Sequence, residues 1–465
     1  MVRQQNSPNH ILIAQEGPSR GCSVSKIGVR RLLTAVALSS LLLSVPSLTA
    51  PAFADSQARV VRLSEVQGDV KIDRNLGQGY EKAFLNLPIM QGEKLQTKSD
   101  GRAEVEFEDG STLRITPDTV IEFPQLSLRD SGAKVSAVHL QEGIAYVNFA
   151  GAKGDEFTLT FAHEKIAIAQ AAHLRLEVAD VTATVAAFKG DVRVEGDSGT
   201  VAVSKNRTAT FDLTNGDRST LAKDVEPDPF DAWDKQLDQY HQQYGSNTYR
   251  SYSPYAYGTS DLNYYGNFFN APGYGTVWQP YFAGAGWDPY MNGAWAFSPG
   301  FGYGWVSGYP WGWTPYHYGS WAYLPTYGWA WQPGGTWAGY SGPRIIRPPA
   351  NFVSPQPPAS SVQEIVPVNR GPVPVQVGRS FNRLEISQNS AGLGIPRGGI
   401  KNLNQLSSTV QQQGFATAKV HTAALGTNSS RAGNYASASQ MGAWHGGGAP
   451  SASAGHSSSG HSSRH

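Results

Sequence analysis

The sequence predicts a mainly β protein, in which an all-β domain is followed by a small tryptophan- and glycine-rich β-hairpin repeat domain and a disordered C-terminal tail. Apolar and polar side chains alternate with a period of two from Arg59 to about Leu213, which is typical of half-buried strands. Ten of the twelve tryptophans lie between Trp278 and Trp337, interspersed with tyrosine and glycine. The 51 glycines and 29 prolines favour turns and extended segments over helices.

The composition argues against several classes of protein. The chain of 465 residues is long enough for two or three domains. Its formal net charge of +1 argues against binding to nucleic acid, or to a membrane surface, through the charge of the whole molecule. The single cysteine, Cys22, precedes the expected signal cleavage site, so we expect a mature chain without disulfides, a cysteine nucleophile or cysteine-bound metal.

The N-terminal segment, residues 1–54, has the features of a secretory signal peptide. Two arginines precede the apolar run of residues 32–45, and the sequence Ala-Phe-Ala at residues 52–54 forms a small-x-small cleavage site. An uncleaved membrane anchor is the less favoured alternative, because the run is shorter than the ~20 apolar residues that span a bilayer. We expect cleavage near Ala54, a periplasmic or secreted location, and no transmembrane segment in the mature chain.

Residues 59–223 are assigned to the all-β domain, because short alternating segments recur there between turn residues. In residues 103–115, three glutamates alternate with apolar side chains, and an Asp-Gly turn leads into a second strand, which predicts a half-buried hairpin. We interpret the three glutamates as a solvated strand face, in preference to a cation-binding or acid/base site: Glu104, Glu106 and Glu108.

Four motifs in this domain resemble the FecR domain family. They are residues 68–70 (GDV), 87–97 (LPIMQGEKLQT), 100–105 (DGRAEV) and 109–117 (DGSTLRITP). The resemblance covers roughly residues 59–212 and implies an extracytoplasmic β-rich module with solenoid-like stacking of short strands. Iron-sensing FecR proteins carry a cytoplasmic anti-sigma segment and a membrane span ahead of this module. Here a short polar lead precedes a cleavable-looking signal, so their regulatory role does not transfer directly.

The period changes to three and four residues over residues 228–245, where one helix face is aromatic and apolar: Phe230, Trp233, Leu237, Tyr240 or His241, and Tyr244. We expect Asp228 to cap this helix, Pro229 to occupy its first position and Gly245 to end it. The pattern favours a connector helix that packs its aromatic face on a neighbouring domain. A partner-binding helix is the alternative.

Residues 260–340 contain an internal repeat. The pattern W-x-P-Y-x-x-G-x-W begins at Trp287 and recurs at Trp313, 26 residues later, and a second aromatic strand follows each copy. A degenerate copy spans residues 265–278. Each unit is the size of a hairpin, so the segment predicts a β-hairpin repeat domain. With the preceding helix, it resembles a tryptophan-rich domain of unknown function that often follows FecR domains in secreted bacterial proteins.

Two interpretations of the aromatic side chains remain open. They form the core of a small domain with few aliphatic residues, which we favour for most of them, or they are platforms on which a sugar ring, a glycan strand or an aromatic peptide stacks. The candidate stacking residues are Trp311, Trp313, Tyr316, His317, Trp321, Trp329 and Trp331. His317 has no carboxylate or histidine nearby in sequence, so we expect a hydrogen-bonded core residue there.

Residues 341–465 are predicted to be a disordered tail, because they are rich in Pro, Gly and Ser and poor in apolar residues. The tail is basic, and two roles are equally favoured: a linker, or contact with an anionic envelope polymer. Its last histidines have flexible spacing without fixed geometry, so no metal site is assigned to them: His445, His456, His461 and His465.

These features predict a non-enzymatic extracytoplasmic protein with a binding or scaffold role at the cell envelope. An envelope glycan or envelope protein is the expected partner, and neither nucleic acid nor a cofactor is expected. The sequence has no G-x-S-x-G nucleophile motif, and an enzyme would need a site assembled from distant residues. The alternative is FecR-type signal transduction, or anti-sigma regulation coupled to transport.

Overall fold

A computed structural model describes residues 59–216, 218–245, 255–281, 286–299, 301–337, 344–359 and 364–370, with the backbone of residues 373–377 and 380–384. They belong to one compact unit, Gln57–His465. The predicted signal peptide and the part of the predicted tail after residue 384 lie outside the described residues. Strands make up 52% of the structure and helices 9%, so the mainly β prediction is confirmed.

The N-terminal β domain contains seventeen strands in one hydrogen-bonded network. The strands are β1 (Val61–Gln67), β2 (Val70–Asp73), β3 (Tyr80–Lys82), β4 (Pro88–Ile89), β5 (Lys94–Thr97), β6 (Arg102–Glu106), β7 (Thr112–Ile115), β8 (Val120–Leu128), β9 (Lys134–Phe149), β10 (Glu156–Phe161), β11 (Glu164–Ile168), β12 (Ala172–Val178), β13 (Thr182–Lys189), β14 (Val192–Gly196), β15 (Gly199–Val203), β16 (Arg207–Asp212) and β17 (Arg218–Ala222).

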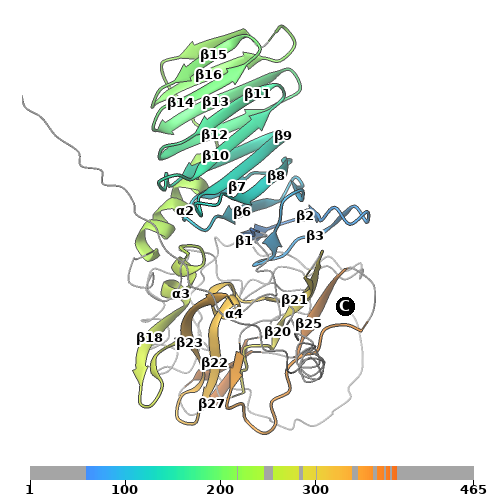
Figure 1. The fold of residues 1–465 in the computed structure, drawn as a ribbon, viewed down its shortest axis with the longest axis vertical. Coiled ribbons are helices and arrows are strands. Elements are labelled where there is room, and N and C mark those ends of the chain that lie inside the picture. The colour runs from blue at the N-terminus through green and yellow to red at the C-terminus, as the bar shows by residue number, and fades with distance from the viewer. Residues whose placement is uncertain are drawn as a thin grey trace, which may run out of the picture. The chain divides into compact units, whose positions relative to one another are not determined.

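These strands are stacked in two layers over one core (Figure 1). The first layer runs β1, β6, β7, β9, β12, β13, β16, β17. The second layer runs β3, β2, β5, β8, β9, β10, β11, β14, β15. The long strand β9 belongs to both. Leu174 of the first layer and Leu159 of the second are fully buried in the same cluster, so the predicted stacking of short strands is present.

The hairpin predicted at residues 103–115 is formed by β6 and β7, with Ala103 opposite Ile115 and Val105 opposite Leu113. Its turn contains Gly110 at a φ of 89°, a conformation that glycine adopts without strain. The family motifs GDV and DGR meet at a second close approach. A Cβ atom on Gly68 would lie 2.1 Å from the backbone oxygen of Asp100, so only glycine fits there.

Helix α2 (Asp231–Tyr244) follows the β domain and begins two residues after Pro229, its predicted first position. Asp228 does not cap it: its Oδ1 accepts hydrogen bonds from the Phe230 backbone N–H and from the Tyr146 hydroxyl on β9. The end is as predicted, since the Gly245 N–H donates to the backbone oxygen of His241. Phe230 occupies the N-cap position instead, and Asp228 joins the start of the helix to β9.

The aromatic region consists of hairpins and two short helices. Its elements are α3 (Thr259–Tyr265), β18 (Gly266–Ala271), β19 (Gly275–Pro280), β20 (Asn292–Ser298), β21 (Gly302–Ser307), α4 (Thr314–His317), β22 (Tyr318–Leu324) and β23 (Gly328–Trp337). The hairpins divide between two sheets, one with the order β18-β19-β23-β22-β24 and one with the order β21-β20-β25. The degenerate copy forms β18 and β19, so all three copies are hairpins.

The two complete copies pair their strands alike. Trp295 lies opposite Trp305 in the first, and Trp321 opposite Trp331 in the second. The reverse face of the first hairpin carries small side chains that join the core of the β domain: Ala294, Ala296 and Val306. The first hairpin therefore has one face in the aromatic core and one against the β domain.

Ordered structure continues beyond residue 341, where we predicted that disorder begins. β24 (Arg344–Ile346) pairs in parallel with β22, and β25 (Ile365–Asn369) pairs antiparallel with β20. A further hairpin consists of β26 (Val373–Val377) and β27 (Ser380–Leu384). The first two segments pair because the edges of β20 and β22 offer backbone groups that an added strand satisfies.

Candidate functional site

The seven candidate stacking residues lie in the interior of the aromatic region. Their exposed fractions range from 0% to 4%: Trp311, Trp313, Tyr316, His317, Trp321, Trp329 and Trp331. Most belong to one aromatic cluster with Tyr290, Trp295 and Trp305. A flat ligand needs an exposed ring face, so the burial supports the core interpretation for these seven residues. A ligand could reach them only if covering residues moved.

His317 illustrates this packing. Its ring stacks on Trp337 at 4.6 Å between centroids and meets Trp313 edge-on at 4.4 Å. Nearby, the Tyr316 hydroxyl donates a hydrogen bond to the backbone oxygen of Pro289. Burial raises the pKa of Tyr316 well above its ordinary value, so this hydroxyl stays protonated and keeps its role as a donor.

Rings that are open to solvent lie at the tips of two neighbouring hairpins. Tyr327, in the β22–β23 turn, is 45% exposed, and its ring centroid is 5.1 Å from that of half-buried Phe269 on β18. Tyr274, in the β18–β19 turn, is also half-buried. Gln279 donates to the backbone oxygens of Tyr327 and Trp329, which fixes the turn that carries Tyr327.

The three alternating glutamates of residues 104–108 are not a solvated face, which corrects our prediction. Glu104, Glu106 and Glu108 are 0%, 2% and 6% exposed. Glu108 pairs with Arg59 at 2.7 Å and Glu106 with Arg62 at 3.0 Å. The period of two identifies their shared face correctly, but residues from α2 and the aromatic region cover that face.

Arg62, on β1, joins the β domain to the aromatic region and is 0% exposed. Its guanidinium donates to Glu106 on β6 and to Asn86. It also donates to Asp261 on α3, at 2.5 Å, and to the backbone oxygen of Pro310. Burial raises the pKa of Glu106, while the charge of Arg62 opposes this shift. The Arg62 side chain therefore donates hydrogen bonds to acceptors in both the β domain and the aromatic region.

Helix α2 is held on the first layer of the β domain by a second buried arginine. Arg114, on β7, lies 2.9 Å from Glu104, 2.5 Å from Asp234 and 2.7 Å from Asp238. The carboxylates raise the pKa of Arg114 against the opposing effect of burial, so the guanidinium stays charged. Arg175, on β12, adds a third contact with Asp231 at 2.6 Å.

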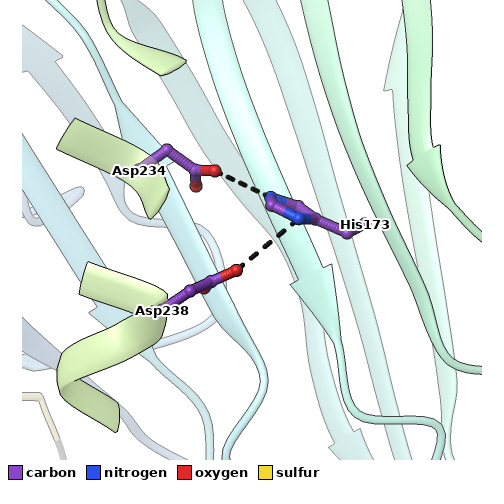
Figure 2. Close-up of side chains that lie close together, drawn as sticks. All are labelled: His173, Asp234 and Asp238. Atoms are coloured by element: carbon purple, nitrogen blue, oxygen red, sulfur yellow. Dashed lines mark ion pairs between the residues drawn. The ribbon is translucent and has the colours of Figure 1, made fainter. Parts of the chain in front are cut away.

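Asp234 and Asp238 also face His173, on β12 (Figure 2). Asp234 Oδ2 lies 2.9 Å from His173 Nε2, and Asp238 Oδ2 lies 3.5 Å from Nδ1. One ligand atom from each residue lies within 4.8 Å of the other two, and among the described residues this is the one group of three that could hold a metal ion. The side chains of His173 and Asp238 are each 14% exposed.

The sequence did not identify Arg62, Arg114 or His173 as residues that join separate elements of the structure. A signal was present, because polar residues occupy the same alternate positions on neighbouring strands: Arg62 lies opposite Glu106, and Glu104 opposite Arg114. Such cross-strand pairs of opposite charge are expected between adjacent strands. The missing information was which strands are adjacent, and that a helix covers them.

Two protein families match separate parts of the chain. The FecR protein family matches residues 93–193. A second family, described as a family of unknown function (DUF6600), matches residues 259–343. The chain therefore contains a FecR domain followed by a DUF6600 domain, which confirms the two resemblances seen in the sequence. No curated protein matches it.

Two crystal structures of a proposed anti-sigma factor from Parabacteroides distasonis ATCC 8503 are similar to part of the chain, each at 16% identity. The 1.65 Å structure matches over 28% of this chain and 59% of its own, with a TM-score of 0.25. The 2.50 Å structure matches over 34% and 69%, with a TM-score of 0.26. The chain therefore spans less than two thirds of the first structure's length.

The expected absence of a transmembrane segment concerns the mature chain. Among the helices that the structure describes, none combines the length and the apolar character needed to cross a bilayer.

Proposed function

We propose that the protein is a non-enzymatic, extracytoplasmic binding protein of the cell envelope, and that its ligand is an envelope glycan. The observation that carries this proposal is the group of rings at and beside the hairpin tips, Phe269, Tyr274 and Tyr327, which are half-buried or exposed whereas the five candidate tryptophans are enclosed. An exposed aromatic face stacks on the apolar face of a sugar ring and buries a large area at low entropic cost.

The surroundings of these rings favour binding. Gln332 donates to the backbone oxygen of Tyr274, as Gln279 does to that of Tyr327, so both turns are fixed before a ligand arrives. Arg347 donates to the Tyr274 hydroxyl and lies 5.5 Å from its ring centroid, which adds a cation beside the rings. Binding to a fixed site loses less conformational entropy than binding to a mobile one.

The proposal is tested by co-sedimentation of the purified full chain with insoluble peptidoglycan. Tyr327→Ala and Phe269→Ala are compared with Tyr80→Ala, a control on β3 at a residue that is 40% exposed. We expect the first two variants to weaken binding about tenfold, as loss of an aromatic anchor does, and the control to bind like the wild type. Wild-type chain that stays in the supernatant, or three variants that bind alike, would contradict the proposal. Capture of an envelope protein that depends on the same rings would replace the glycan by a protein ligand.

FecR-type regulation is the second candidate, and the FecR family match favours it. Its test is the N-terminus of the protein isolated from cells. An uncleaved N-terminus in the inner membrane would support signal transduction, whereas a mature chain that begins at Asp55 would support the secreted binding protein.

A further inference from the structure

We propose that His173, Asp234 and Asp238 form a binding site for one divalent transition-metal ion, which links α2 to the first layer of the β domain. This site is separate from the hairpin rings, and the proposal does not depend on glycan binding. It rests on the placement of three ligand side chains, on the distribution of charge around them and on the hydrogen bonding of the histidine.

The placement suits a single ion. Asp234 and Asp238 are four residues apart on α2, so both carboxylates project from one helix face toward His173 on β12 (Figure 2). Metal–nitrogen and metal–oxygen bonds of about 2.0–2.2 Å bring neighbouring ligand atoms to about 3–3.5 Å from one another. Asp234 Oδ2 lies 2.9 Å from His173 Nε2, whereas the 3.5 Å contact of Asp238 Oδ2 is with the other ring nitrogen, Nδ1. One ligand atom from each of the three residues lies within 4.8 Å of the other two, so an ion bound to Nε2 requires Asp238 to move toward that nitrogen.

The carboxylates at this position outnumber the positive charge of Arg114, which favours the binding of a cation. Arg114 is shared by three carboxylates, since it contacts Glu104 as well as Asp234 and Asp238. The Arg114 guanidinium donates hydrogen bonds to the Oδ1 atoms of Asp234 and Asp238, and the Oδ2 atoms of these aspartates face His173. Asp234 is 3% exposed, and a buried carboxylate without full compensation is costly. A divalent ion at the Oδ2 atoms supplies two further positive charges.

The histidine itself points to a ligand. His173 Nε2 is a buried atom that makes no hydrogen bond with the described residues, although Asp234 Oδ2 lies 2.9 Å from it. A neutral imidazole offers a lone pair at such a nitrogen, which a metal ion accepts. The partial exposure of His173 and Asp238 leaves a side through which the ion and a water ligand can enter.

The donor set identifies the class of ion. One imidazole and two carboxylates suit Zn²⁺ or Mn²⁺, whereas Ca²⁺ and Mg²⁺ prefer oxygen ligands alone. Three protein ligands leave a coordination position for water. Because one ligand is on the β domain and two are on α2, the ion would hold the helix in place and stabilise the folded chain.

The experiment uses the full chain, with the four tail histidines replaced by alanine so that they cannot bind the probe: His445, His456, His461 and His465. Zn²⁺ is titrated calorimetrically into this EDTA-treated and dialysed protein. We expect one equivalent to bind and to raise the thermal midpoint. His173→Gln and Asp238→Asn should each weaken binding at least tenfold, and the control His139→Gln, on β9, should not.

A second measurement covers the case in which a variant does not fold. Crystals of the otherwise wild-type chain soaked in Zn²⁺ are measured at the zinc absorption edge, and the anomalous peak should lie between His173 and the two aspartates. No saturable binding, binding that both variants leave unchanged, or a peak elsewhere overturns the proposal. If the chain binds no Zn²⁺ but His173→Gln lowers its stability, the group is an ion-pair contact only.

Discussion

Arg62 on β1 and Asp261 on α3 are 199 residues apart in the sequence, and their side chains form a buried ion pair with 2.5 Å between Nη2 and Oδ2. This pair joins the FecR-like domain to the helix that opens the aromatic region. Because the Arg62 side chain is 0% exposed and Asp261 is 1% exposed, water cannot replace either partner. The pair therefore makes the folding of the two parts interdependent.

Replacement of Arg62 by methionine should destabilise the protein strongly. The variant removes the guanidinium that faces Glu106 and Asp261 in the interior, and breaking such a buried pair costs about 3–5 kcal/mol. Urea unfolding measured by tryptophan fluorescence checks this. The matched control is Arg129→Met, because the Arg129–Glu156 pair is exposed and should contribute about 1 kcal/mol or less. Equal effects of the two substitutions would contradict a role for Arg62 in joining the domains.

Trp321→Ala should lower the free energy of unfolding by about 3–5 kcal/mol, because it leaves a cavity in the aromatic core. Trp321 is 0% exposed, and its ring lies 5.6 Å from the rings of Trp287 and Tyr316. Tyr327→Ala, on the surface, should change stability by less than about 1 kcal/mol. Chemical denaturation of both variants gives the comparison. A stable, well-folded Trp321→Ala protein would contradict the core interpretation and support a ligand-stacking role for Trp321.

The stability of the protein should fall as the pH rises from about 4.5 to about 7, in part because of Glu93. Burial raises the pKa of this carboxyl to about 7, although Arg74, at 3.5 Å, opposes the shift. In that window the unfolded carboxyl has lost its proton and the folded one keeps it, so the folded state is favoured at the lower pH. The contribution lost by pH 8 is about 3 kcal/mol.

Urea unfolding of the wild type and Glu93→Gln between pH 5 and pH 8 checks this contribution. The amide does not titrate, so the free energy of unfolding of the variant should depend less on pH than that of the wild type. The slope, and not the absolute stability, is the readout, because the substitution also changes the contact with Arg74. Parallel pH profiles would show that Glu93 ionises normally in the folded protein.

Gly68→Ala should destabilise the FecR-like domain more than Gly77→Ala. Both glycines have positive φ, 68° and 76°, so each substitution carries a similar backbone strain of about 1 kcal/mol. At Gly68 the new Cβ would also lie 2.1 Å from the backbone oxygen of Asp100, whereas at Gly77 no atom lies within 4 Å. The difference between the thermal midpoints isolates the steric contribution. If both midpoints fall equally, the close approach of the GDV and DGR turns does not contribute to stability.

The sequence by itself determined the local structure of this protein. Alternation of period two placed the β6–β7 hairpin correctly, and the 26-residue offset between Trp287 and Trp313 identified the repeated hairpins. Turn glycines and the ordered family motifs located the FecR-like domain. These features are local because strand pairing in a hairpin depends on neighbouring residues and on the turn between them.

Only the tertiary structure decided which polar and aromatic faces are buried. Glu104 and Glu106 follow the pattern of a solvent-facing strand, yet His241 on α2 contacts both carboxylates, and the Gly258 N–H at the start of α3 donates to Glu106. The five candidate tryptophans, which by pattern alone could be a core or a platform, are enclosed, and solvent reaches the tyrosines at the hairpin tips. His173 meets Asp234 and Asp238 across more than sixty positions of sequence. The physical reason is that burial and ion pairing depend on which elements pack together, and the period of a single strand carries no information about that packing.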